Sequence, residues 1–352
     1  MLKLMEVING ILLHGVGASS AALCYTPQKQ VRSWSWQTYW LAQAFVCWFA
    51  LPILVAVITI PQLGTVLSQA PTSAMINSFL LGMGYGIGGT AFGIAIRYVG
   101  FSLTYAISVG ISCVLGTLIP PLVNGTLSET LSGYGANFVI IGIVLGAVGI
   151  ALCGVAGRKK EKDLEKANNT QTGFSLSKGL PICLLAGVLS AFYGFAIEQG
   201  QPIADVAATY GAGNLQSNVI YIFSNTGAFV TTGLYCLYLH LKQKTFSEYR
   251  TAGKAVLGKN FLMAAITGVL WYGQFFFYGL AHVRMGSYKF SSWAIHMIML
   301  VLISSIVGIL LKEWKPTQQK TKTYLAIALT VLLAAVLVIT YGNYLGGNET
   351  NG

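Results

Sequence analysis

Four polar and aromatic residues recur at intervals of three and four between positions 271 and 282. They are Trp271, Gln274, Tyr278 and His282, and this spacing places them on one face of a helix. An indole, an amide, a phenol and an imidazole offer flat apolar faces to C–H surfaces and mixed donors and acceptors to hydroxyl groups. The strip therefore fits a neutral polyol. The structural alternative is an interfacial aromatic belt with an amide in the core.

Three residues elsewhere in the chain could line the same cavity. Trp293 lies one helical turn before a histidine, Asn225 lies inside another apolar segment, and Tyr25 ends the first one. A further indole, amide and phenol would extend the same chemistry. We predict that these three residues also contact the ligand.

Titratable side chains are rare within the apolar segments. The candidates are His14, Glu198, His282 and His296. Histidine titrates near physiological pH and a carboxylate can be tuned toward it, so each of these groups could carry a coupling proton. For each histidine the alternative is a structural hydrogen bond. For Glu198 the alternative is a place in outer-face water.

The elements that must position these residues are apolar segments of about twenty residues. The chain has 352 residues, of which 55% are hydrophobic and 9% charged, and its mean hydropathy is +0.66. A soluble chain of this composition would expose more apolar surface than its core could hide, so lipid must be the solvent for most of it. A backbone in lipid must satisfy its own hydrogen bonds, which favours helices. We predict an all-α membrane protein with ten transmembrane helices, over residues 7–25, 38–60, 74–96, 99–121, 137–156, 179–198, 217–241, 260–281, 290–311 and 323–342.

The basic residues indicate the orientation of these spans. All of the 21 Lys and Arg residues except Lys3, Arg284 and Lys289 fall in loops that follow odd-numbered spans. The positive-inside rule makes those loops cytoplasmic, so both termini should face the periplasm. The net charge of +11 therefore reports topology and attraction to anionic lipid, and we predict no nucleic-acid partner.

The chain divides near its middle. Residues 158–178 form the strongly polar linker, and five predicted spans lie on each side of it. If the halves share a fold, an odd number of spans per half requires the second half to be inserted upside down. We therefore predict two inverted five-helix repeats, 1–157 and 179–352, joined by a cytoplasmic linker. Within the third span, small residues including Gly82 and Gly86 predict close approach of another backbone.

No arrangement of residues points to catalysis. The sequence has no nucleophile motif, and its six cysteines form no close pair and no metal-binding spacing. Gly84-Tyr-Gly86-Ile-Gly88-Gly89 matches a nucleotide-binding pattern by letter, but that pattern requires a preceding strand, and here it lies in a predicted membrane helix. We predict no enzymatic activity, no catalytic residue, no cofactor and no bound metal.

Ordered motifs along nearly the whole chain resemble one known family. They are Ser33-Trp34-Ser35-Trp36 with Thr38 and Trp40, Gly116-Thr117-Leu118-x-x-Pro121-x-x-Asn124-Gly125, Trp271-Tyr272-x-Gln274-Phe275-Phe276-Phe277-Tyr278, His282-x-Arg284, Ser292-Trp293-x-x-His296-Met297 and Leu311-Lys312-Glu313-Trp314. This pattern is similar to that of the L-rhamnose/proton symporter family of the drug/metabolite transporter superfamily. The chain departs from the family pattern at Lys289, where the family has an acidic residue, and at Glu198, where it has none.

The resemblance implies a function and a location. It implies uptake of a 6-deoxyhexose, L-rhamnose above all, in symport with a proton by alternating access in a bacterial inner membrane, as a monomer or homodimer. Two alternatives stay open from the residues alone. One is an importer of another monosaccharide, and the other is a drug or metabolite exporter on the same fold.

Overall fold

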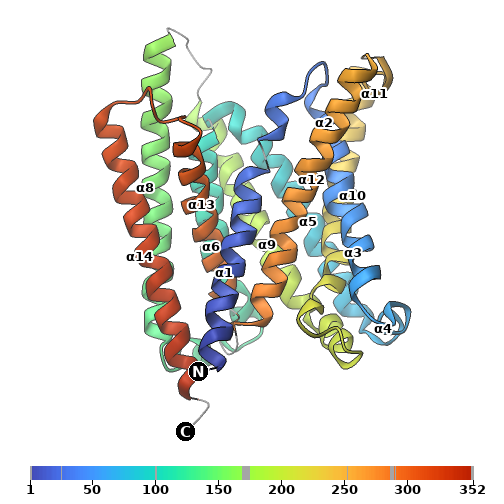
Figure 1. Ribbon diagram of the computed structural model, residues 1–352, viewed down its shortest axis with the longest axis vertical. Coiled ribbons are helices and arrows are strands. Elements are labelled where there is room, and N and C mark those ends of the chain that lie inside the picture. The colour runs from blue at the N-terminus through green and yellow to red at the C-terminus, as the bar shows by residue number, and fades with distance from the viewer. Residues whose placement is uncertain are drawn as a thin grey trace. The chain divides into compact units, whose positions relative to one another are not determined.

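The regular elements of the protein are helices. The computed structural model describes residues 2–24, 26–99, 101–168, 175–251, 253–285, 289 and 291–349, and no strand occurs in that part of the chain (Figure 1). The longer helices are α1 Leu2–Leu23, α2 Trp36–Ala44, α3 Leu51–Thr59, α5 Thr72–Val99, α6 Phe101–Val123, α8 Ala136–Asn168, α9 Leu176–Thr209, α10 Asn218–Gln243, α12 Lys254–Val283, α13 Ser292–Leu310 and α14 Gln319–Glu349. The short helices are α4 Leu63–Gln69, α7 Leu127–Ser132 and α11 Glu248–Thr251, and a π-helix, η2, covers Phe45–Ala50.

Nine helical segments in the described residues are long and apolar enough to cross a membrane. They overlap nine of the ten predicted spans and begin with Met5–Gln30 and Trp36–Thr59. Many large apolar side chains of these helices are exposed, as expected of surfaces that face hydrocarbon. The all-helical membrane class is therefore confirmed.

The remaining predicted span, 217–241, coincides with α10. This helix has 26 residues, enough to extend about 39 Å, but it is not among the nine apolar segments. Several of its polar side chains are turned inward and form hydrogen bonds with neighbouring helices. Asn218 donates from Nδ2 to Thr59 Oγ1 at 3.0 Å, and the hydroxyls of Thr231 and Thr232 donate to backbone carbonyls of α5 at 3.0 and 3.4 Å. Inward polar groups lower the helix's hydropathy without exposing polarity to lipid.

The described chain forms two compact units, each assembled from separate stretches of sequence. Unit 1 comprises Met1–Ser19, Gly88–Gly194 and Ala281–Gly352, and unit 2 comprises Ser20–Ile87 and Phe195–Leu280. The boundaries between the units fall inside α1, α5, α9 and α12. Both units therefore contain residues from both halves of the sequence.

Unit 1 is built on a pair of long helices, α8 and α14, which run side by side (Figure 1, green and red). Small residues bring them together, since a Cβ at Gly149 would lie 2.7 Å from Leu332. The helices α6 and α13 pack against the same pair. Close packing of small residues is the main source of helix association in lipid, where the hydrophobic effect gives no preference for helix contacts.

The helix α8 continues into the predicted linker, since it ends at Asn168 and not near residue 157. Charges of opposite sign support this extension, with Arg158 3.5 Å from Glu161 on the next turn. The extension also bonds to the segment before α14. Lys160 Nζ lies 2.9 Å from Glu313 Oε2, and Asp163 accepts hydrogen bonds from the Gln318 N–H and the Thr321 hydroxyl at 3.0 and 2.8 Å.

Unit 2 depends on the crossing of α5 and α10. A Cβ at Gly82 would overlap the backbone carbonyl of Ser224, and a Cβ at Gly227 would overlap the carbonyl of Phe79. Gly86 faces Ala228 and Thr231 in the same way. The predicted close approach at Gly82 and Gly86 is thus confirmed, and it is what allows the threonines of α10 to reach carbonyls of α5.

We predict that Gly82→Val disrupts unit 2. The added side chain has no space at the crossing, so α5 and α10 must separate, with a loss of stability of about 3 kcal/mol or more. Thermal unfolding of the detergent-solubilised protein measures the effect. Gly258→Ala is the matched control, because Gly258 is an exposed glycine in α12 with nothing within 4 Å of its would-be Cβ, and alanine there should be neutral or stabilising. An unchanged unfolding temperature in Gly82→Val would contradict the described crossing.

Candidate functional site

Most of the predicted ligand-binding strip lies in unit 2, on α12. Trp271, Gln274 and Tyr278 are all buried, as expected for one face of a helix that is turned away from lipid. Trp271 is flanked by two further indoles, Trp40 at 5.4 Å and Trp48 at 5.2 Å between ring centroids, both meeting it edge to face. A single helix face therefore presents an indole, an amide and a phenol in sequence.

Two other predicted residues accompany this strip in unit 2. Asn225 is fully buried in α10. Glu198 is half-buried in α9 and lies close enough to Tyr278 for the two side chains to interact electrostatically. The predicted contact residue Tyr25 lies outside the described residues.

Trp293 belongs to unit 1, where it packs tightly. Its indole N–H donates to the carbonyl oxygen of Ser112 at 2.8 Å. Its ring fits against two glycines, Gly116 and Gly194, at which a Cβ would come within 3.2 Å of the indole or closer. This geometry gives Trp293 a structural role as a link between α13, α6 and α9, while contact with a ligand stays a prediction.

The three candidate histidines for proton transfer come together in unit 1. The rings of His14 on α1 and His296 on α13 lie 5.7 Å apart between centroids, and His282 at the end of α12 is near enough to interact with His14 electrostatically. All three are buried. Lys289 acts on His282 in turn, so the positive charge of Lys289 lies close to this cluster.

Sequence reasoning missed a polar group on α2 and η2. Trp40, Gln43 and Trp48 are buried together in unit 2, and both tryptophans contact Trp271. Trp40 entered the sequence analysis only as part of a family motif. The spacing of five residues from Gln43 to Trp48 does not match a regular α-helix face, which requires spacings of three or four. The π-turn over Phe45–Ala50 leaves no mark in the hydropathy pattern, so no sign of this group appears in the sequence.

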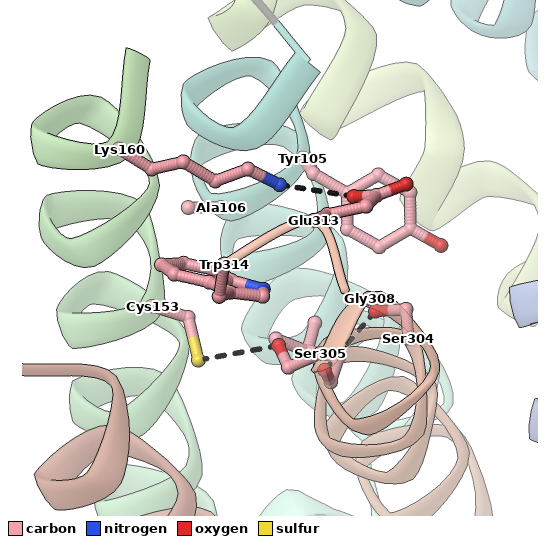
Figure 2. A pocket seen from close by; sticks show the side chains of 10 residues that line it. Tyr105, Ala106, Cys153, Lys160, Ser304, Ser305, Gly308, Glu313 and Trp314 are labelled. Carbon is pink, nitrogen blue, oxygen red and sulfur yellow. Dashed lines mark hydrogen bonds and ion pairs between the residues drawn. The ribbon is translucent and has the colours of Figure 1, made fainter. Parts of the chain in front are cut away.

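A pocket of about 90 Å³ in unit 1 is too small to hold a small organic ligand. Figure 2 shows it beneath the ion pair of Lys160 and Glu313, with Trp314 and Cys153 on its walls. Lys160 also lies over the Trp314 ring, 4.8 Å from its centroid. Pockets for small organic ligands usually begin near 300 Å³. The contacts around this one fasten the end of α8 to the segment after α13.

Comparison with known proteins gives a consistent result over nearly the entire chain. Residues 4–344 match the family model described as L-rhamnose-proton symport protein (RhaT). An L-rhamnose-proton symporter of Mannheimia succiniciproducens is 34% identical over 341 residues, covering 96% of this chain and 98% of that protein. Proteins of the same name from Cronobacter sakazakii and Escherichia coli are 34% and 32% identical, with the same coverage.

Apolar helices that enclose a buried strip of indole, amide and phenol define an integral membrane protein with an internal polar site. The chain belongs to the L-rhamnose-proton symporter family. This family consists of sugar–proton symporters, which are transporters and not enzymes. The family resemblance inferred from the sequence motifs is thereby confirmed.

We predict that Trp293→Phe destabilises the protein by about 1 kcal/mol, because the phenyl ring keeps most of the packing but loses the hydrogen bond to Ser112. The measurement is the thermal unfolding midpoint in detergent. Trp36→Phe is the control, since the ring of Trp36 stacks on Trp40 at 5.0 Å between centroids and that stacking survives the change. Equal midpoints for the two variants would remove the structural role assigned to Trp293.

Proposed function

We propose that this protein imports L-rhamnose together with a proton by alternating access. The observation that carries the proposal is the match to the L-rhamnose-proton symporter family over residues 4–344, together with relatives of that name at up to 34% identity over almost their full length. The buried strip on α12 supplies the chemistry that a neutral, hydroxyl-rich ligand needs.

The proposed architecture is ten transmembrane helices in two inverted repeats, residues 1–157 and 179–352. The composition of the two units supports it. The first part of α1 and the first part of α9 belong to unit 1, and the remainders of both belong to unit 2. The helices α5 and α12 are divided in the opposite sense, with their beginnings in unit 2 and their ends in unit 1. An inverted repeat pairs α1 with α9 and α5 with α12, so partner helices are divided in the same way.

The proposed location is the bacterial inner membrane with both termini in the periplasm. The basic residues support this orientation, because nearly all of them follow odd-numbered spans and such loops stay in the cytoplasm. The cytoplasmic side then includes the charged end of α8. Its lysines and arginine also suit contact with anionic lipid headgroups.

In the proposed mechanism the sugar rests against Trp271 and forms hydrogen bonds with Gln274, Tyr278 and Asn225. All four residues are buried in unit 2, where hydrogen bonds to a ligand are protected from competition by water. The apolar C–H face of the pyranose ring stacks on the indole, and the amide and the phenol form hydrogen bonds with its hydroxyl groups. Trp293 remains a candidate contact on unit 1.

The proton is proposed to reside in the cluster of His14, His282 and His296, with Glu198 as the other candidate. Coupling requires that the proton and the sugar change each other's affinity for the two access states. Moving one charge through 100 mV supplies about 2.3 kcal/mol, which supports a sugar gradient of roughly fifty-fold before any pH gradient is counted. A single coupled proton is therefore sufficient for scavenging uptake.

The first test records external pH as single sugars are added to proteoliposomes that contain the purified protein. L-rhamnose is expected to produce alkalinisation, because each imported sugar takes a proton from the outside, while L-fucose, L-mannose and D-glucose give little response. Protein-free liposomes and a protonophore provide the controls. A response to a different sugar would keep the mechanism and change the substrate, and no response to any sugar in folded protein would favour the exporter reading.

Gln274→Ala tests the proposed sugar site. Loss of a buried amide that binds hydroxyl groups should weaken sugar binding by roughly ten-fold or more while the protein stays folded in the membrane. Binding is measured by equilibrium uptake of labelled L-rhamnose. Gln216→Ala is the matched control, since Gln216 and Gln274 are each 9% exposed and both lie in unit 2. Unchanged sugar affinity in Gln274→Ala would exclude Gln274 from the site.

The role of the histidine cluster is tested by measuring sugar exchange across the membrane and sugar accumulation against a gradient in separate assays. We expect that at least one of His14→Gln, His282→Gln and His296→Gln still exchanges labelled for unlabelled L-rhamnose across the membrane but no longer accumulates it against a gradient. Glutamine keeps a hydrogen-bonding amide but does not bind a proton at physiological pH. Normal accumulation by all three variants would remove the cluster from the coupling mechanism and leave Glu198→Gln as the next variant.

A further inference from the structure

We propose that Gln43, between Trp40 and Trp48, is a specificity-determining residue of the sugar site, where its amide binds two adjacent hydroxyl groups of the monosaccharide. The inference rests on the proposed transport function and adds to it a second wall for the ligand. All three residues lie in unit 2, together with Trp271. They come from α2 and the π-helix η2.

The π-helix brings the three side chains into line. In a regular α-helix Trp48 would point about 80° away from Trp40, because eight residues turn through two full turns and that remainder. The wider turn over Phe45–Ala50 rotates Trp48 back toward the face that carries Trp40. The contacts agree, since the indoles of Trp40 and Trp48 both meet the edge or face of Trp271. Isolated π-turns inside α-helices occur frequently at functional sites.

The polar atoms on this face have no hydrogen-bond partner among the described residues. They are Nε1 of Trp40, Nε1 of Trp48 and both Nε2 and Oε1 of Gln43. Trp48 and Gln43 are completely buried and Trp40 is 3% exposed. A buried polar group without a partner destabilises the protein, and four such atoms on one helix face require a functional explanation.

The helix α12 packs closely against the segment that contains Gln43. Gly268, one turn before Trp271, allows α12 to approach so closely that a Cβ there would lie 3.0 Å from the Gln43 carbonyl oxygen. The hydroxyl of Tyr272, the residue after Trp271, is also buried without a hydrogen-bond partner among the described residues. Buried donors and acceptors without a hydrogen-bond partner among the described residues thus occur on α2, η2 and α12.

The set of atoms matches a sugar better than it matches an ion or an apolar molecule. The Gln43 amide offers a donor and an acceptor side by side, which suits two hydroxyls on adjacent ring carbons. The two indole N–H groups donate to hydroxyl oxygens, and the indole rings accept C–H groups, including the methyl group that distinguishes a 6-deoxyhexose. No formal charge is present among these side chains, so the ligand class is a neutral monosaccharide.

The same helix contains a buried glutamine that serves as a comparison. Gln37 is 3% exposed, and its Nε2 donates to Gln243 Oε1 at 3.0 Å and to Thr245 Oγ1 at 2.9 Å. Gln37 therefore has a structural role that the described contacts explain. Gln43, six residues further along, is completely buried and has no such bonds among the described residues.

The experiment measures binding of L-rhamnose and of its 2-, 3- and 4-deoxy analogues to wild type, Gln43→Met and Gln37→Met. In wild type, removal of either hydroxyl bound by Gln43 is expected to weaken binding roughly ten-fold or more. In Gln43→Met, binding of L-rhamnose itself falls ten- to a hundred-fold, and the penalty for removing those two hydroxyls disappears. Intrinsic tryptophan fluorescence reports binding, since three indoles surround the site.

Thermal unfolding without sugar gives an independent readout. Gln43→Met removes an unpartnered amide, so its unfolding temperature should equal or exceed that of wild type. Gln37→Met should unfold at a lower temperature and keep the wild-type pattern of deoxy-sugar affinities. Trp48→Phe replaces the indole by a phenyl ring and so removes the N–H; it should lose discrimination for one hydroxyl. This second variant keeps the test decisive if Gln43→Met does not fold.

The outcomes separate this inference from the proposed function. If wild-type proteoliposomes take up protons with L-rhamnose while Gln43→Met and Trp48→Phe keep wild-type affinities for every analogue, the role of Gln43 is wrong and the transport function stands. If wild type neither binds L-rhamnose nor responds to it, the transport function fails and the role of Gln43 fails with it. Loss of discrimination in Gln43→Met and, for one hydroxyl, in Trp48→Phe, with Gln37→Met unaffected, supports the assignment.

Discussion

The structure depends on one constraint, which is that hydrocarbon offers no hydrogen bonds. Every polar group inside a span must find its partner within the protein. The threonines of α10 meet this requirement at carbonyls of α5, and buried Ser291 and Asn343 meet it with each other at 3.1 Å. Such bonds depend on close helix approach, and close approach depends on glycine at positions such as Gly82. The same constraint makes the unpartnered amide of Gln43 conspicuous.

The sequence predicted well those features that follow from composition over long windows. The apolar spans coincide with the helices because a transmembrane segment must be apolar along most of its length. The close helix approach at the small residues of α5 could also be predicted from the sequence. Their regular spacing identified one helix face, although it did not identify α10 as the partner. The α12 strip followed from the same reasoning, and its four members, Trp271, Gln274, Tyr278 and His282, are buried.

The features that sequence reasoning missed depend on local geometry or on distant partners. A π-turn differs from an α-turn by one residue of register, which hydropathy does not reveal, so Gln43 and Trp48 were overlooked. The packing of Trp293 could not be predicted, because it depends on two glycines from different helices that face its ring only in the folded protein. The predicted fifth span ended at residue 156 and residues 158–178 were assigned to a polar linker, although pairs such as Arg158 and Glu161 at helical spacing could have indicated that α8 continues.

The extension of α8 carries a consequence for the order in which the molecule is made. Lys160 bonds to Glu313, 153 residues further along the chain, and Asp163 bonds to Thr321, 158 residues further along. On the ribosome, the chain up to the end of α8 is therefore synthesised long before the partners of these charges emerge. Until then Lys160 and Asp163 lack these partners, and the end of α8 has the ion pairs within its own helix, such as that of Arg158 with Glu161. Truncation before residue 313 would leave the bonds of Lys160 and Asp163 unformed.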